Sequence, residues 1–117
     1  MKYMMMFWVD ESAAVTADED ADMMIAVKSW AEKMEERGIL LGGGALRSAG
    51  EARIVRVRDG DVLVSDGPFA ETKEQIGGYS VLECADLATA TAIAAGHPLA
   101  WTATVEVRPY WDAPWDH

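Results

Sequence analysis

The sequence predicts an α+β fold in which two helices pack on one face of a sheet. Segments typical of strands and helices follow one another as strand, helix, strand, then a hairpin, then strand, helix, strand. The chain has 117 residues, enough for one domain and not for two. Half of its residues are hydrophobic, so this single domain can bury a substantial core.

The first strand is predicted over residues 2–9, where the chain is apolar on both alternating faces. Such a strand belongs in the middle of a sheet, covered above and below. It contains three consecutive methionines, Met4 to Met6, whose thioethers would suit a soft metal ion. In a strand, however, Met5 points away from both neighbours, so we interpret the three side chains as packing residues.

The first helix is predicted to begin after Thr16, because Thr16 and Glu19 have the spacing of a capping box. Arg37 and Gly38 are expected to end it, the glycine in a left-handed conformation. Apolar residues recur at helical spacing on one face between these ends, namely Met23, Val27, Trp30, Ala31 and Met34.

A second strand is predicted over residues 39–46, with three adjacent glycines, Gly42 to Gly44, inside it. No Lys-Ser/Thr pair follows them as in a phosphate-binding loop, so we interpret them as a bulge or as the close approach of another backbone. Residues 52–65 then form the clearest hairpin, since Asp59-Gly60 suits a type I′ turn. This turn pairs valines with valines on one face.

The last part of the chain repeats the pattern of the first. Residues 75–84 are a predicted strand, Asp86 is the predicted N-cap of a short helix that ends near Gly96, and residues 104–108 alternate as a last strand. This order describes a ferredoxin-like sandwich with an inserted β-hairpin and with its helices on one face. The other face needs cover, and a second subunit is the simplest source, so we expect a homodimer.

The charge of the chain narrows the classes of partner. Ten Lys and Arg residues against twenty Asp and Glu residues give a formal net charge of −10, which repels phosphate backbones and anionic lipid. We therefore expect no nucleic-acid and no membrane partner.

Cys84 is the only cysteine, which excludes an intramolecular disulfide. Nothing resembles a signal peptide or a spanning helix, so a cytoplasmic protein is expected.

A family resemblance rests on the stretch SDGPFAETKEQIGGY, residues 65–79. DGPFAETKE, the Gly-Gly-Tyr after it, and VEVRP at residues 105–109 resemble the DGPF-type branch of the YCII-related proteins. The opening MKYMMMFWVDE and the later ERGILLGGGAL fit the same pattern, so the resemblance describes a single domain over residues 1–117. It implies a ferredoxin-like subunit that pairs into a dimeric α+β barrel.

The resemblance also carries a reaction hypothesis, acid–base catalysis by a His–Asp pair with the His on the first helix. That helix has no His in this chain, whose histidines are His97 and His117. His97 stands beside a helix C-terminus, which favours its positive form, and we interpret it as a capping residue. No dinucleotide loop, catalytic triad or metal-ligand spacing is found in the sequence, so no cofactor and no metal are expected.

Two pairs of charged side chains are candidates for chemistry instead. In an extended chain Glu71 and Lys73 project to one side, either as an ion pair or as a base beside a cation that holds an anionic substrate. Glu106 and Arg108 share a face of the last strand, where Arg108 can grip a carboxylate through two hydrogen bonds. The two pairs either meet with Asp66 and Tyr79 in one polar cavity or bridge the subunits of the dimer, and the sequence leaves both open. The catalytic candidates are Asp66, Glu71 and Lys73, and the ligand-binding candidates are Glu106, Arg108, Tyr79 and Trp30.

These observations support two hypotheses of different classes. In the first, the homodimer binds a small organic molecule in the cavity, and its architecture suggests lyase, isomerase or cofactor-free oxygenase activity by analogy alone. In the second, it is a non-catalytic interaction or regulatory module of an alternative sigma factor system, because similar proteins are often encoded beside such factors. The sequence leaves open whether the protein is an enzyme.

In the stretch that carries the resemblance, Phe69 is expected to anchor the turn to the core.

Overall fold

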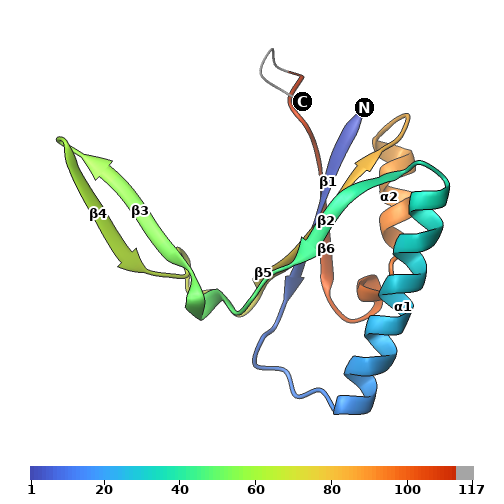
Figure 1. Ribbon diagram of the computed structural model, residues 1–117, viewed down its shortest axis with the longest axis horizontal. Helices are drawn as coiled ribbons and strands as arrows, with labels where there is room; N and C mark the ends of the chain where they lie inside the picture. Colours follow the sequence, from blue (N-terminus) through green and yellow to red (C-terminus); the bar gives the residue numbers. More distant parts are fainter. Residues whose placement is uncertain (113–117) are drawn as a thin grey trace.

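A four-stranded antiparallel sheet carries both α-helices of the described chain on one of its faces (Figure 1). The computed structural model describes residues 1–112, so His117 lies outside the described residues. The predicted α+β fold is confirmed, with the element order of a ferredoxin-like chain. In chain order the elements are β1 (Lys2–Val9), α1 (Ala17–Glu36), β2 (Leu40–Ala45), the 3₁₀ turn η1 (Ala49–Glu51), β3 (Arg53–Arg58), β4 (Asp61–Asp66), β5 (Gln75–Glu83), α2 (Leu87–Ala95), the 3₁₀ turn η2 (Pro98–Trp101) and β6 (Thr104–Pro109).

The sheet has the strand order β2-β5-β1-β6, which places β1 in its middle as predicted. Tyr3, Met5 and Phe7 of β1 are buried beneath the helices, where they pack with Leu82 of β5. The alternate residues of β1 point to the other face and are only half-buried. One face of the sheet therefore forms the core, and the opposite face, which we call the open face, is not covered by either α-helix (Figure 1).

Helix α1 begins and ends as its sequence predicts. Thr16 is the N-cap, and its hydroxyl oxygen accepts the backbone N–H of Glu19 at 3.1 Å. Gly38 follows the helix with φ of 72°, the left-handed conformation that glycine adopts without strain. Trp30 and Met34 are the buried residues of the helix, on the face that the apolar spacing indicates.

Both interpretations of the glycines in β2 hold. The pairing of β2 with β5 shifts register between Leu40 and Gly42, as in a bulge. Gly43 has φ of 154°, and a Cβ atom there would collide with the carbonyl oxygen of Tyr79 on β5. A glycine at position 43 thus allows two backbones to approach more closely than a side chain permits.

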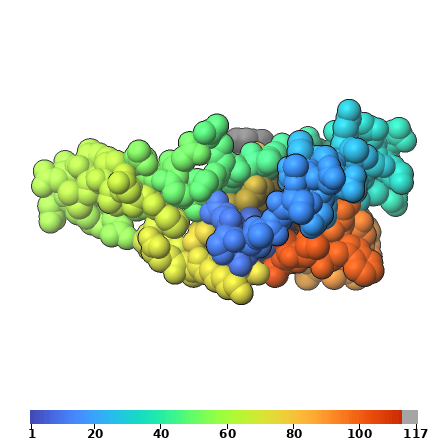
Figure 2. Space-filling model, turned by 90° about the horizontal axis from the view of Figure 1, so that it is seen from below, coloured from blue at the N-terminus to red at the C-terminus, as the bar shows by residue number. Residues whose placement is uncertain are grey.

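The β3–β4 hairpin forms a separate two-stranded sheet that extends away from the body as an arm (Figures 1 and 2). Its predicted register is confirmed, with Val55 opposite Val64 and Val57 opposite Val62, and Asp59-Gly60 at the turn. These four valines are 58–66% exposed. The arm extends the molecule: its radius of gyration is 16.3 Å, against about 13 Å for a compact domain of this length.

The expected role of Phe69 was wrong. Its side chain is 73% exposed and packs on the arm, where the Arg56 guanidinium lies 5.3 Å from the ring centroid. A cation–π contact at an exposed site contributes roughly 0.5–1 kcal/mol. Phe69 therefore connects the turn to the arm and not to the core.

Candidate functional site

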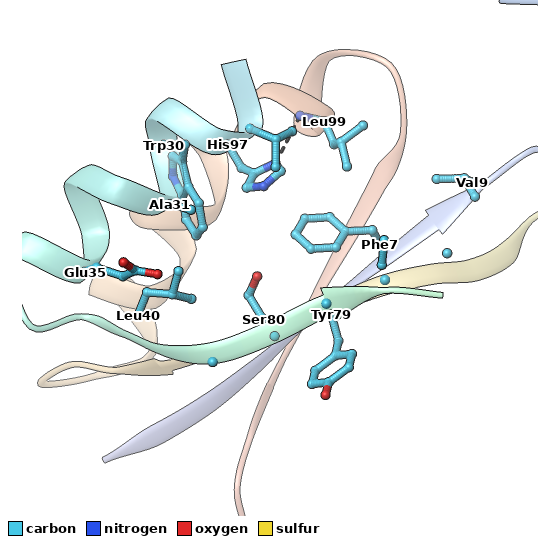
Figure 3. Close-up of a pocket in the computed structure, with 17 residues that line it drawn as sticks. Phe7, Val9, Trp30, Ala31, Glu35, Leu40, Tyr79, Ser80, His97 and Leu99 are labelled. Atoms are coloured by element: carbon cyan, nitrogen blue, oxygen red, sulfur yellow. Dashed lines mark hydrogen bonds between the residues drawn. The ribbon is translucent and has the colours of Figure 1, made fainter. Parts of the chain in front are cut away.

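A pocket of about 400 Å³ opens between α1 and the sheet (Figure 3). Val27, Trp30 and Ala31 of α1 form one wall, and glycines of β2 and β5 form much of the floor. Because glycines have no side chains, the space above this part of the sheet stays open. The volume lies in the range of ligand-binding pockets, roughly 300–1,000 Å³.

His97 is the most deeply buried polar residue that lines this pocket, with 1% of its surface exposed. Its ring is held between Phe7 and Trp30, with centroids 4.5 Å from each. Nδ1 accepts the backbone N–H of Leu99 at 3.0 Å, so the side chain caps η2 as its N-cap. The capping role is confirmed, but His97 caps η2, which follows it, and not the end of α2, which precedes it.

The expectation that the preceding helix end favours the positive form of His97 was wrong. Burial lowers the pKa of this imidazole from 6.5 to about 4, because the apolar surroundings disfavour the charged form. His97 is therefore neutral at physiological pH. Since Nδ1 accepts a hydrogen bond, it carries no proton, and the single N–H of the neutral ring is on Nε2.

The Nε2–H group of His97 and the hydroxyl of Ser80 have no protein partner within residues 1–112. Ser80 is 8% exposed and stands on the floor of the pocket, on β5. In Figure 3 the His97 ring and the Ser80 hydroxyl point into the same space from opposite sides. Every fully buried side-chain nitrogen or oxygen of the described chain has a hydrogen-bond partner. Because these two groups have none, they are accessible from the pocket. Both groups are thus available to a molecule in the pocket.

Charge in the pocket is limited to one carboxylate. Glu35 of α1 is the only Asp, Glu, Lys or Arg among the described residues that line it. The other lining side chains are apolar or aromatic, apart from Ser80, His97 and Tyr79. The pocket is suited to a largely apolar molecule that is fixed in orientation by a few polar contacts.

Two of the ligand-binding candidates from the sequence line this pocket in different ways. Trp30 contributes its ring, which packs edge-on against His97 at an interplanar angle of 66°. Tyr79 contributes its backbone, because its ring points to the open face of the sheet (Figure 3).

The other two ligand-binding candidates lie on the open face, since they alternate along β6 with Val105 and Val107, which pack against the core. Glu106 accepts a hydrogen bond from the indole Nε1 of Trp8 at 2.9 Å. Arg108 is exposed and pairs across the strands with Met4. These two residues are on one face, as predicted, and that face is opposite the pocket.

The catalytic candidates lie on and beside the arm. Asp66 ends β4 and forms an exposed ion pair with Arg53 at 3.4 Å. Glu71 and Lys73 are in the irregular segment between β4 and β5, which forms neither a strand nor a helix. None of the three lines the pocket beneath α1. Their catalytic roles stay predictions.

The sequence reading missed His97 and Ser80 as pocket residues. Ser80 had a signal, because it alternates on β5 with Gly78 and Leu82, whose side faces the helices. A polar residue on a buried strand face needs a partner, and the sequence offered none nearby. His97 had no comparable signal, since its burial depends on how α1 and β1 close over a turn that follows another helix.

Comparison with known proteins adds the family. The family model of the YCII-related domain matches residues 1–115. This chain belongs to the YCII-related family. An uncharacterized protein of Rhizobium meliloti (strain 1021) is 35% identical to this YCII-related protein over 113 residues, which cover 93% of this chain and 91% of the relative. The similarity spans the sheet, the arm and the pocket.

Two kinds of feature are absent from residues 1–112 of this YCII-related protein. None of the helices there is both long and apolar enough to cross a membrane. No cluster of three or more His, Cys, Asp or Glu side chains in that part of the chain has the arrangement of a metal site.

Proposed function

We propose that this YCII-related protein binds a small, largely apolar organic molecule in the pocket between α1 and the sheet. One observation carries the proposal: Nε2–H of His97 and the hydroxyl of Ser80 belong to buried residues, have no protein partner among residues 1–112, and remain accessible from the pocket. Buried polar groups in folded proteins are normally hydrogen-bonded. A ligand in the pocket supplies the missing partners.

The apolar lining supplies the affinity. Most of the residues that line the pocket are apolar side chains or glycines. Removing apolar surface from water is favourable by roughly 25 cal/mol per Å². A flat molecule of roughly ten to twenty heavy atoms fits a pocket of about 400 Å³ and covers this surface.

We also propose that the protein acts as a homodimer. Its accessible surface is 8347 Å², whereas a compact monomer of 12.7 kDa exposes roughly 6,200 Å². The excess is larger than the area, about 800 Å², that each partner buries in a standard interface. Surface that pairing would cover includes the half-buried Met4, Met6 and Trp8 on the open face and the exposed valines of the arm. Pairing through the open face agrees with the dimeric α+β barrel that the family resemblance implies.

The binding proposal is tested with N-phenyl-1-naphthylamine, an uncharged dye that fluoresces strongly in apolar surroundings. We expect the wild-type protein to bind it and an Ala31→Trp variant to bind it at least tenfold more weakly, because the added indole fills the pocket. Ala21→Trp is the matched control, since Ala21 is exposed on the same helix and does not line the pocket. Absence of binding by the wild type, or equal binding by all three proteins, would contradict the proposal.

A further inference from the structure

We infer that the ligand of this pocket is an uncharged molecule with a carbonyl oxygen, and that His97 binds this oxygen through Nε2–H. The inference rests on the proposed function and adds to it the chemical class of the ligand. The established family membership assigns no ligand to this site.

The first step concerns the direction of the hydrogen bond. The bond from Leu99 N–H to Nδ1 leaves Nε2 as a donor and not an acceptor. Nε2 therefore requires an acceptor atom on the ligand, which an ammonium group or a hydrocarbon does not have. His97 cannot remove a proton from the ligand through this nitrogen, so its contribution is recognition and polarisation of the acceptor.

The second step concerns the number of hydrogen bonds that the acceptor can receive. The Ser80 hydroxyl approaches the same space from the sheet, opposite the His97 ring (Figure 3). Two donors on opposite sides match an oxygen with two lone pairs and no hydrogen of its own. A ketone, quinone, ester or amide carbonyl has this form.

The third step concerns charge. An anionic oxygen would also accept both bonds, but no Lys or Arg of the described chain lines the pocket, and Glu35 does. Moving a carboxylate out of water without a paired cation is costly. The formal net charge of −10 adds long-range repulsion. These terms select a neutral carbonyl compound over a carboxylate of the same shape.

The fourth step concerns shape. The rings of Phe7 and Trp30 stand on either side of the imidazole, 4.5 Å from it by their centroids. Aromatic side chains on both sides of the donor favour a flat ligand whose oxygen projects from the edge of its ring system. An aryl ketone combines these properties.

The test uses three probes of one shape: 2-acetylnaphthalene, 2-isopropenylnaphthalene, in which CH₂ replaces the oxygen, and 2-naphthoate. Their affinities are measured by competition with the naphthylamine dye. We expect the ketone to bind roughly tenfold more tightly than the alkene, because one hydrogen bond of good geometry raises the affinity by about that factor. The carboxylate is expected to bind more weakly than either. Equal affinities for ketone and alkene, or preference for the carboxylate, would overturn the inference.

Two substitutions assign the preference to His97. Asn at position 97 keeps an oxygen that can cap η2 but does not extend to the position of Nε2. Gln places an amide N–H near that position. We expect the ratio of ketone to alkene affinity to fall to about one in His97→Asn and to recover in part in His97→Gln. A ketone preference that survives in His97→Asn would refute the assignment.

A measurement on the wild type keeps the inference testable if a variant does not fold. The ¹⁵N chemical shift of His97 Nε2 is expected to move on titration with the ketone and to stay in place with the alkene. If neither the ketone nor the alkene binds, the proposed function is wrong, and the inferred ligand class is wrong with it. If both bind but Nε2 responds to neither, the pocket is a binding site and only the ligand class is wrong.

Discussion

Leu99 donates its backbone N–H to Nδ1 of His97 at a distance of 3.0 Å, so a turn of the backbone orients a side chain that lines the pocket. The same contact caps η2 and determines which nitrogen of the imidazole carries the proton. Burial then keeps the ring neutral. A local turn at Pro98 thus presents one hydrogen-bond donor, of known position and charge, to the space beneath α1.

Stability is expected to fall as the pH is lowered from about 6.5 to about 4. The pKa of His97 is lowered from 6.5 to about 4 by burial, so in this window the unfolded chain takes up a proton that the folded chain does not. We expect the free energy of unfolding to decrease by roughly 2 kcal/mol across the window from this residue.

Urea unfolding at pH 7 and at pH 4.5 measures the effect. His97→Asn has no titrating side chain at this position, so its stability is expected to vary less over the same interval. The comparison removes the carboxylates that titrate in both proteins. If the two proteins lose stability equally between these pH values, His97 is not the buried neutral group described above.

Gly43→Ala is expected to destabilise the fold by about 2 kcal/mol or more, because the new methyl group meets the backbone of Tyr79 and Ser80 and the local φ of 154° is unfavourable for alanine. Gly44→Ala is the matched control, since a Cβ atom there has no neighbour within 4 Å. It is expected to change stability by less than about 1 kcal/mol. Thermal or urea unfolding compares the two. Similar losses in both variants would show that β2 and β5 do not approach as closely as described.

Val81→Asp is expected to shift the protein from dimer to monomer. Val81 is half-buried on the open face, opposite Met4, and a carboxylate placed in an apolar interface loses its hydration without a partner. Ile25→Asp is the control, because Ile25 is exposed on the outer side of α1. Sedimentation velocity at micromolar concentration measures both. A monomeric wild type, or a Val81→Asp variant that remains dimeric, would contradict pairing through this face.

Arg108→Ala and Glu71→Gln separate the pocket from the polar cavity that the sequence suggested. Neither residue lines the pocket, so both variants are expected to bind the naphthylamine dye within about twofold of the wild type. Loss of binding in either variant would favour a site built from the two charged pairs, and would place the ligand outside the space between α1 and the sheet.

Most of the fold could be predicted because local rules decide it. The capping pair Thr16 and Glu19, the left-handed Gly38 and the Asp59-Gly60 turn each define an element boundary from nearby residues alone. The apolar periodicities of β1 and α1 then identify the faces that meet. In each of these cases the interaction that decides the structure joins residues close together in the sequence.

The candidate site could be predicted only in part, because its decisive contacts join residues far apart in the sequence. Phe7, Trp30 and His97 come from three parts of the chain, and no local pattern indicates that their rings will pack together. The charged candidates lie away from this pocket for another reason. Alternation correctly placed Glu106 and Arg108 on one face, but it does not say which face of a sheet carries a pocket.

The central claim is that the pocket beneath α1 binds a carbonyl compound at His97. A crystal structure of the protein with 2-acetylnaphthalene tests it most directly. We expect the naphthalene to lie between Trp30 and the glycine floor, with the ketone oxygen about 3 Å from Nε2 of His97. A ligand bound elsewhere, or one in the pocket whose oxygen points to solvent, would contradict it.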